Sequence, residues 1–343
     1  MFNLRNLDCW EVLDIRSIPP GAPVMKSKWV YKYKLDANRA LKKHRARIVA
    51  KGFTQIENFN YFETFAPVAH ASTIRLILSL TSVPDFKAYQ FDVSVAFIEA
   101  PLNADEPNIY CQPPPGYENP KKYVYLLRKH LYGMKQSGRG WILLLRDILE
   151  SFNLTRLKTD ESVWVLRIPN LRDHTTNDRP YHDCSSSEAT LILISYVDDL
   201  LVLSNCPSLV DELEKHCNKR VKINNEGPAH WYLNVRYQRD PITGAVSASQ
   251  ELYINKLLRD YGLENCNSIP VPFPATGDTI LKQLALPPTN PSPSLTKDYQ
   301  KLIGSLLYLQ THTVPEISYA LSVLSRYLQN PGDTHMHYAR KIL

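Results

Sequence analysis

The 343-residue sequence predicts an α+β fold, because strand-like and helix-like segments follow one another without the regular alternation of a βαβ protein. Two apolar runs, Leu191 to Ser195 and Leu200 to Leu203, flank a short polar break and predict paired antiparallel strands. Amphipathic patterns predict helices at Ser72 to Ser82 and at Gly140 to Phe152. With 44% hydrophobic residues, the chain can bury a sizeable core and form more than one domain.

The C-terminal half continues the mixture, with helical patterns at Ser208 to Arg220, Gln250 to Tyr261, Tyr299 to Leu309 and Ile317 to Leu328. Gly262 is placed to be the C′ residue that ends one of these helices. The segment Ile269 to Leu295 holds seven prolines and predicts an extended linker. The polar stretch Pro169 to Glu188 predicts a surface loop.

The polar break between the two apolar runs reads Tyr196-Val197-Asp198-Asp199 and predicts a hairpin turn with two adjacent acids. Neighbouring carboxylates repel each other by about 1 kcal/mol at ~4 Å in water, and by more at lower dielectric. Mg²⁺ suits such a pair, because it takes one or two carboxylates and completes its shell with water and phosphate oxygens. The alternative is an ordinary hairpin with a solvated acidic turn.

A second acid lies in the strand-like segment Tyr89 to Ile98, where Asp92 stands among apolar and small residues and Phe97 follows five positions later. A carboxylate within an apolar strand is costly unless it is paired or binds a metal. The sequence therefore predicts either a metal-binding Asp92 or a strand-end acid in solvent.

The basic excess of the chain, net +6 with a pI near 8.8, is concentrated near the N-terminus. From Lys26 to Lys51 there are ten Lys or Arg and a single acid, Asp36. Alternation from Trp29 to Lys34, a turn near Asp36 and a strand over Arg45 to Ala50 predict a hairpin with aromatic residues between the cations. Such a positive face either contacts phosphates, with binding that weakens steeply in salt, or is simply solvated.

Other signals limit the class of protein. The longest apolar runs fall well short of a membrane span, and the N-terminus lacks a signal-peptide core, so we expect no membrane partner and cytoplasmic residence. Six cysteines form no C-x-x-C pair, which predicts reduced thiols and no zinc site.

Taken together, the acidic segments resemble those of the reverse transcriptases of copia-type long-terminal-repeat retrotransposons. Further blocks in the same order carry the likeness over most of the chain: Arg45 to Gln55, Tyr61 to Val68, Thr73 to Arg75, Leu131 to Gln136, Tyr232 to Val235 and Leu302 to Leu309. Each block alone is a weak signal, whereas their common order makes chance similarity implausible.

The resemblance implies a right-hand polymerase fold, with fingers and palm in residues 1–245 and with the thumb and connecting helices in residues 246–343, truncated before a ribonuclease H domain. It implies that Asp92 and Asp198 bind two Mg²⁺ ions, or Mn²⁺ in their place, and that Asp199 contributes charge and weaker ligation. Two such ions ~3.5 to 4 Å apart activate a primer 3′-hydroxyl and neutralise a leaving pyrophosphate.

The resemblance also assigns substrate-binding positions. Arg45, Arg47 and Lys51 would contact the triphosphate. The Phe97 ring would clash with a 2′-hydroxyl and so select deoxynucleotides, a plain core phenylalanine being the alternative. Tyr196 belongs to the same set as part of the YVDD turn.

The block Leu131 to Gln136 would lie under the templating base pair. There Gly133 permits close backbone approach, and Lys135 and Gln136 would reach phosphate or base. Tyr232 to Val235 would be a primer-gripping turn, or else an unremarkable strand. The family's glycine in that turn is Asn234 here, and asparagine tolerates positive φ better than most residues.

These implications predict an RNA-directed DNA polymerase acting on dNTP and an RNA or DNA template with its primer. Other parts of a retrotransposon polyprotein would be partners. An active element would place the chain in a cytoplasmic virus-like particle, with the nucleus as a second location. Two alternatives remain: a catalytically inactive remnant that only binds nucleic acid, and an unrelated two-metal hydrolase that uses the same carboxylates.

Overall fold

The computed structural model describes residues 8–35, 41–102, 106–169, 183–184, 186–269, 271, 277–286 and 292–343. Helices mix with mainly antiparallel sheets, as the α+β prediction expected. The chain divides into two compact units, Met1–Pro228 and Ala229–Leu343. This division falls before the domain boundary at residue 245 that the sequence predicted. The assignment of fingers, palm and thumb to these units stays a prediction.

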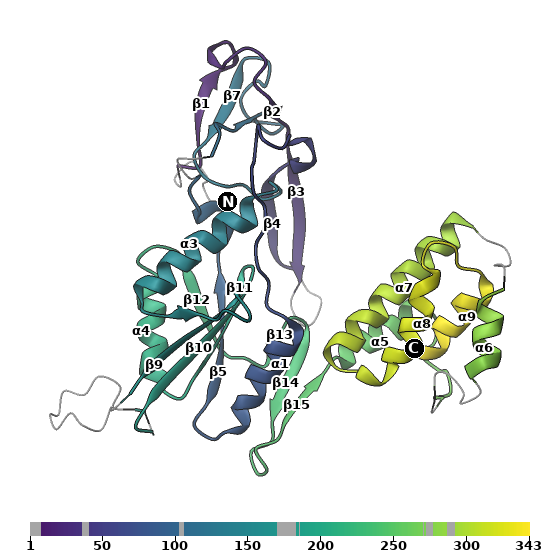
Figure 1. The fold of residues 1–343 in the computed structure, drawn as a ribbon. Helices are drawn as coiled ribbons and strands as arrows, with labels where there is room; N and C mark the ends of the chain where they lie inside the picture. The colour runs from purple at the N-terminus through teal and green to yellow at the C-terminus, as the bar shows by residue number, and fades with distance from the viewer. Residues whose placement is uncertain are drawn as a thin grey trace. The chain divides into compact units, whose positions relative to one another are not determined.

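The first unit is built on a six-stranded antiparallel sheet (Figure 1). Its strands, in spatial order, are β12 (Ile223–Pro228), β5 (Lys87–Val93), β11 (Asp199–Ser204), β10 (Ala189–Tyr196), β9 (Val163–Ile168) and β8 (Thr155–Arg156). The predicted hairpin is thus confirmed as β10–β11, at the centre of the sheet. Leu200 to Leu203 are buried at every position, which explains why this strand is continuously apolar instead of alternating.

Helices α3 (Ser137–Ser151) and α4 (Pro207–Cys217) contribute their apolar faces to the core on this sheet. Trp141, Leu145 and Ile148 of α3 pack there with Leu191 and Leu193 of β10. Helix α1 (Ala71–Ser79) continues as a 3₁₀ turn over Leu80–Ser82. The helices predicted at Ser72 to Ser82 and Gly140 to Phe152 are therefore confirmed, the second with an earlier start.

The strand that carries Asp92 is shorter than the sequence suggested. Strand β5 ends at Val93, and the short helix α2 (Ala96–Glu99) follows it. Phe97 therefore lies on a helical turn beyond the strand and not on the strand itself. The prediction of one strand-like segment from Tyr89 to Ile98 was wrong in its second half, because apolar character alone does not separate a short strand from a helical turn.

A small sheet and a hairpin complete the first unit. The sheet has the order β1 (Trp10–Asp14), β7 (Tyr123–Leu127), β6 (Tyr110–Cys111), β2 (Val24–Met25), and only its β2–β6 pair is parallel. The predicted basic hairpin is confirmed as β3 (Ser27–Leu35) and β4 (Leu41–Ala50). Its turn near Asp36 lies outside the described residues, as does most of the loop predicted at Pro169 to Glu188.

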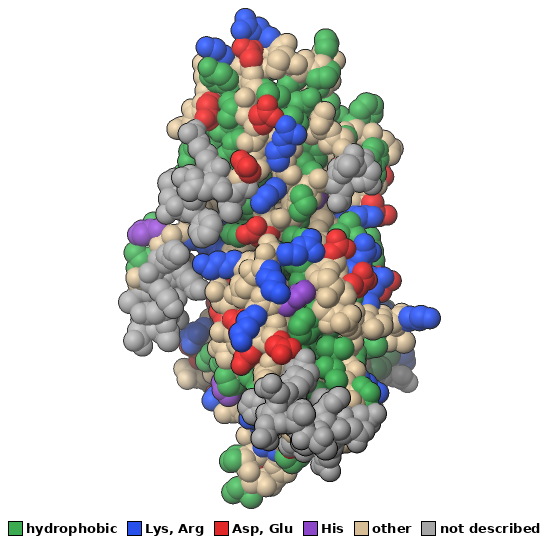
Figure 2. All heavy atoms as spheres, turned by 90° about the vertical axis from the view of Figure 1, so that its left-hand side faces the viewer, with side chains coloured by type: hydrophobic (Ala, Val, Ile, Leu, Met, Phe, Trp, Pro, Cys, Tyr) green, Lys and Arg blue, Asp and Glu red, His purple; other side chains and the backbone are tan. Residues whose placement is uncertain are grey.

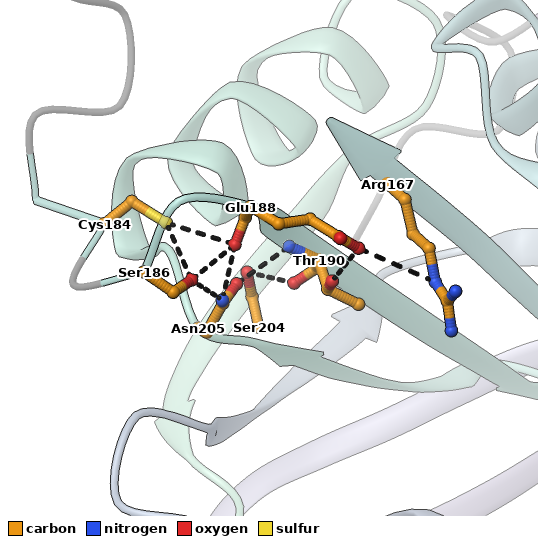
Figure 3. A network of polar contacts seen from close by, with 7 residues as sticks. All are labelled: Arg167, Cys184, Ser186, Glu188, Thr190, Ser204 and Asn205. Atoms are coloured by element: carbon orange, nitrogen blue, oxygen red, sulfur yellow. Dashed lines mark hydrogen bonds and ion pairs between the residues drawn. The ribbon is translucent and has the colours of Figure 1, made fainter. Parts of the chain in front are cut away.

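Polar contacts hold the β10–β11 hairpin at the end away from its turn (Figure 3). The Asn205 side chain donates to Ser186 Oγ at 2.7 Å and to the Glu188 carbonyl at 2.8 Å, and its Oδ1 accepts from the Thr190 N–H at 2.8 Å. Ser204 Oγ donates to the Thr190 carbonyl at 2.8 Å. Because a slip of one residue would exchange the two faces of a strand, these contacts fix which side chains reach the turn.

The second unit joins a three-stranded sheet to a helical core (Figure 1). The sheet contains β13 (Trp231–Tyr232), β14 (Val235–Arg239) and β15 (Val246–Ser249). The helices are α5 (Glu251–Asp260), α6 (Gly277–Leu284), α7 (Pro293–His312), α8 (Ser318–Leu324) and α9 (Asp333–Ile342), with 3₁₀ turns at Pro315–Ile317 and Ser325–Tyr327. Gly262 has φ +65° and ends α5 as predicted.

Two sequence expectations in this unit need correction. The segment Ile269 to Leu295 is not an extended linker throughout, because helix α6 lies within it and buries Ile280 and Leu284 in the core. The seven prolines stand at its two ends and leave a proline-free amphipathic stretch between them. Helix α7 also begins earlier than Tyr299, since Ser292 Oγ accepts from the Leu295 N–H and caps it.

The surface that carries α4 shows acidic and basic side chains interspersed, without a large area of one charge (Figure 2). In the described part of the chain, no helix is both long and apolar enough to cross a membrane.

Candidate active site

The candidate site is built around the turn of the β10–β11 hairpin. Tyr196 pairs with Asp199, so the loop consists of Val197 and Asp198 alone. Val197 has φ +57°, a conformation that β-branched residues rarely adopt. Backbone strain of about 1–3 kcal/mol persists only where the surroundings enforce it, and such positions cluster at functional sites.

The sheet register brings Asp92 to this turn. Asp92 of β5 lies directly opposite Asp199 of β11, and the Val93 N–H donates to the Asp198 carbonyl at 3.2 Å. Paired residues in antiparallel strands have Cα atoms about 4.5–5.5 Å apart. Asp92 therefore joins Asp198 and Asp199, which lie more than a hundred positions later in the sequence, at one end of the central sheet.

The charges at this point are unfavourable without a cation. Burial raises the pKa of Asp198 to about 6, and the charges of Asp199 and Asp92 add to that rise, while Arg47 and Arg45 oppose it. Burial likewise raises the pKa of Asp199, with Asp92 and Glu226 acting in the same direction. A carboxylate cluster that resists ionisation in this way is stabilised by a bound cation.

The donor set fits a divalent metal in its chemistry. Asp198 Oδ1 is buried and has no hydrogen-bond partner among the described residues, so it is available as a ligand. Carboxylate oxygens are the ligands that Mg²⁺ prefers. As the side chains stand, no three His, Cys, Asp or Glu residues of the described ranges form a ready metal cage.

A buried tryptophan supports the strained turn. Trp141 of α3 is fully buried, and its Nε1–H donates to the Val197 carbonyl at 2.7 Å. The contact satisfies the carbonyl of the residue with positive φ and ties the turn to the core helix. The sequence offered only one signal for this role, an aromatic residue on the apolar face of a predicted helix.

Arg45 and Arg47 lie near Asp198, and Arg47 and Phe97 both contact the ring of Tyr132. The Arg47 guanidinium lies 4.8 Å from the centre of the Tyr132 ring, and the Phe97 ring meets Tyr132 edge-on at 5.1 Å. Both arginines lower the pKa of Asp198, so their charges act at the turn. Tyr132 was not selected from the sequence, although it stands beside Gly133 within the predicted block.

Gly133 lies where two segments of the backbone pack closely against each other. Gly133 has φ +88°, and a Cβ there would lie 2.3 Å from the Ala50 carbonyl oxygen. The Gly52 N–H donates to the Gly133 carbonyl at 3.1 Å, and the Ala50 N–H donates to the Tyr132 carbonyl at 2.8 Å. The close approach that Gly133 makes here is to the end of β4 that leads into Lys51, and its approach to a templating base pair stays a prediction.

Gln136 differs from its predicted role. Its side chain is buried, accepts from Gln55 Nε2 at 2.9 Å and donates to the Asn60 carbonyl at 2.9 Å. It is thereby engaged in holding the loop that follows β4 and does not reach outward to a phosphate or base. Lys135 is exposed, with Nζ 4.6 Å from the Tyr61 ring centre.

The predicted primer-gripping turn lies in the second unit. Leu233 and Asn234 connect β13 to β14, and both have positive φ, +50° and +59°. Two-residue hairpin loops of this kind require positive φ, which suits Asn234 and strains Leu233. The Tyr308 hydroxyl donates to the Leu233 carbonyl at 2.5 Å and so fixes the strained residue to helix α7.

Comparison with known proteins decides the family. A family model described as "Reverse transcriptase (RNA-dependent DNA polymerase)" matches residues 9–275. The chain belongs to the reverse transcriptase family. Together with the transposon relatives of the chain, this match confirms the resemblance to copia-type retrotransposons drawn from the motifs.

Several relatives of this reverse transcriptase chain are transposon proteins. It is 32% identical over 330 residues to the retrovirus-related Pol polyprotein from transposon TNT 1-94 of Nicotiana tabacum, covering 95% of this chain and 23% of that protein. It is 29% identical over 328 residues to that from transposon RE1 of Arabidopsis thaliana, covering 95% and 20%. A putative transposon Ty5-1 protein of Saccharomyces cerevisiae shares 26% over 262 residues, covering 74% and 73%. The chain thus spans a quarter or less of the plant polyproteins.

Replacing Asp198→Asn is expected to stabilise the metal-free protein at neutral pH. A carboxyl with a raised pKa loses folding free energy as pH rises between its ordinary value of 3.8 and about 6. We expect a gain of about 1–2 kcal/mol at pH 7.5 in EDTA, after allowance for solvent screening, and none near pH 3.5. Thermal unfolding across this range measures it, with the exposed Asp147→Asn as control. An unchanged or lower stability at pH 7.5 would contradict the argument.

Replacing Trp141→Phe should destabilise the protein by about 2–4 kcal/mol, because it leaves a small cavity and deprives the Val197 carbonyl of its donor. It should also increase the Mg²⁺ concentration needed to raise the melting temperature, since the turn loses its support. Trp164→Phe, at another buried tryptophan of the same core, is the matched control. An equal change of the Mg²⁺ response in both variants would show that the hydrogen bond does not orient the turn.

Proposed function

We propose that the chain is an RNA-directed DNA polymerase that joins a dNTP to a primer 3′-hydroxyl on an RNA or DNA template. The observation that carries the proposal is the register that sets Asp92 opposite Asp199 and beside Asp198. In this proposal the six-stranded sheet is the palm, the β3–β4 hairpin belongs to the fingers, and the helices of the second unit form the thumb.

Asp92 and Asp198 would hold two Mg²⁺ ions, or Mn²⁺, with Asp199 adding negative charge. When bound, such ions acidify the attacking hydroxyl and neutralise the leaving pyrophosphate. The raised pKa of Asp198 supports this role, because the carboxylate gains most from a cation where its ionisation is otherwise opposed.

The cationic residues of β4 would position the triphosphate. Arg47 is held over the Tyr132 ring, and the charges of Arg45 and Arg47 already act on Asp198. Held in this way, the guanidinium loses less freedom when it binds a phosphate oxygen. Lys51 directly follows the last residue of β4. The ammonium group of Lys135 lies over the ring of Tyr61.

Phe97 would select the sugar. Its ring is held by the edge-on contact with Tyr132, which gives it a defined position from which to exclude a 2′-hydroxyl. Because Arg47 contacts the same tyrosine, Tyr132 would support both sugar selection and triphosphate binding.

A nucleic-acid binder without catalysis is the second candidate. It is favoured by the lack of three ready metal ligands within the described residues. It would retain salt-sensitive binding without nucleotide incorporation.

Asp198→Asn is expected to reduce Mg²⁺-dependent primer extension on an RNA template by more than about a hundredfold, because a metal ligand is lost. Binding of the primer–template, measured separately by fluorescence anisotropy, should remain. Extension that survives in the variant would refute the assignment. Degradation of a labelled strand without added nucleotide would instead indicate a hydrolase, and binding without extension in the native chain would indicate the remnant.

Phe97→Val is expected to lower the discrimination between dNTP and rNTP by about 10–100-fold, mainly through improved use of the ribonucleotide. Single-nucleotide incorporation with each substrate measures the ratio of kcat/KM values. Phe97→Tyr keeps the ring and should keep the discrimination. If Val and Tyr variants discriminate as well as the native chain, Phe97 is a core residue and not a gate.

A further inference from the structure

The β3–β4 hairpin has two chemically different faces. Its register pairs Trp29 with Ile48, Tyr31 with Ala46 and Tyr33 with His44. The alternate pairs are Val30 with Arg47 and Lys32 with Arg45. Because directly paired residues share a face and successive residues alternate, the rings lie on one face and these cations on the other.

The cationic face is the one that serves the candidate active site. Arg47 of this face lies over the Tyr132 ring, and the Phe97 ring of the candidate site meets the same tyrosine edge-on. The aromatic face is therefore directed away from the catalytic turn, and neither the metal nor the triphosphate proposal uses it.

The aromatic face is anchored at one end and open beyond it. Trp29 Nε1–H donates to the Pro115 carbonyl at 2.9 Å, and the Trp29 ring packs on Tyr117 at 5.6 Å. Tyr31 follows, 6.2 Å from Trp29 and within 20° of parallel to it, while Tyr33 meets His44 at 5.3 Å. Tyr31 and Tyr33 are each 72% exposed. A fixed ring is thus continued by two solvent-facing rings along one strand.

We infer that this aromatic face is a second nucleic-acid site, which binds an unpaired strand by stacking its bases on Tyr31 and Tyr33. Residues two apart on a strand are about 6.6–6.8 Å apart, twice the ~3.4 Å step between stacked bases. Successive rings can therefore each take a base of the same strand. A duplex has no free base faces and would not use the site.

Charge favours a polyanion over an apolar protein partner as the occupant. Lys28, Lys32 and Arg45 are exposed on the opposite face of a ribbon that is only two strands wide. Phosphates on the aromatic side would lie within about one Debye length, ~8 Å at physiological salt, of these cations. Exposed rings interleaved with cations are the usual composition of sites for single strands.

The test measures binding in EDTA and without nucleotide, so that its outcome does not depend on polymerisation. Anisotropy with a labelled single-stranded oligothymidylate and with a labelled duplex is recorded for the native chain and for Tyr31→Leu/Tyr33→Leu. We expect the double variant to bind the single strand about tenfold or more weakly, with an unchanged salt slope and unchanged duplex binding. Lys28→Gln/Lys32→Gln, the matched control, should lower the salt slope instead.

Circular dichroism and thermal unfolding check that both double variants are folded. Single-strand affinity that is unchanged in the tyrosine variant overturns the inference, and so does an equal loss for single strand and duplex. Self-association that depends on Tyr31 and Tyr33, with single-strand binding unaffected, would assign the face to a second copy of the chain and also overturn it. Asp198→Asn, which should reduce extension by more than about a hundredfold, should leave this binding intact. The extension assay therefore tests the proposed polymerase, and the binding assay tests the second site independently of it.

Discussion

The antiparallel pairing of β5 with β11 is the constraint on which the site depends, because it forces like charges together. Asp92 and Asp199 are opposed by register, and Asp198 is held beside them by its backbone. Opposed like charges destabilise a sheet, so the favourable part of this pairing lies in the rest of β11, where Leu200 to Leu203 are buried at every position. The apolar sequence of the strand therefore fixes the carboxylates in an arrangement that they would not adopt by themselves.

Much of this arrangement could be predicted from the sequence. The paired apolar runs predicted the central hairpin, and the alternation from Trp29 predicted the β3–β4 hairpin. These predictions succeeded because each rests on local periodicity. The prediction that Asp92 lies near the turn came from family resemblance. The register of the sheet is the physical observation that establishes it.

The rest depends on contacts between distant segments, which no local pattern encodes. Gln136 was expected to reach substrate and instead bonds to Gln55 and to the Asn60 carbonyl. Tyr132 and Trp141 were not selected, since an aromatic residue in an apolar segment reads as core until its neighbours are known. Phe97 was expected on a strand and lies on α2, because the apolar pattern continues past Val93 while the backbone turns.

The hairpin is held at both ends, and this explains how a strained and charged turn persists. At one end Asn205 and Ser204 join the strands, and at the other Trp141 binds the carbonyl of Val197. With both ends fixed, the turn cannot relax its positive φ or move its carboxylates apart by a backbone shift. The repulsion can then be reduced only by rotation of the side chains or by protonation of a carboxylate. The raised pKa of Asp198 reflects the tendency to protonate. In the proposed polymerase, a divalent cation would relieve the same repulsion without a proton, and a rigid scaffold would favour its binding because the carboxylates cannot separate.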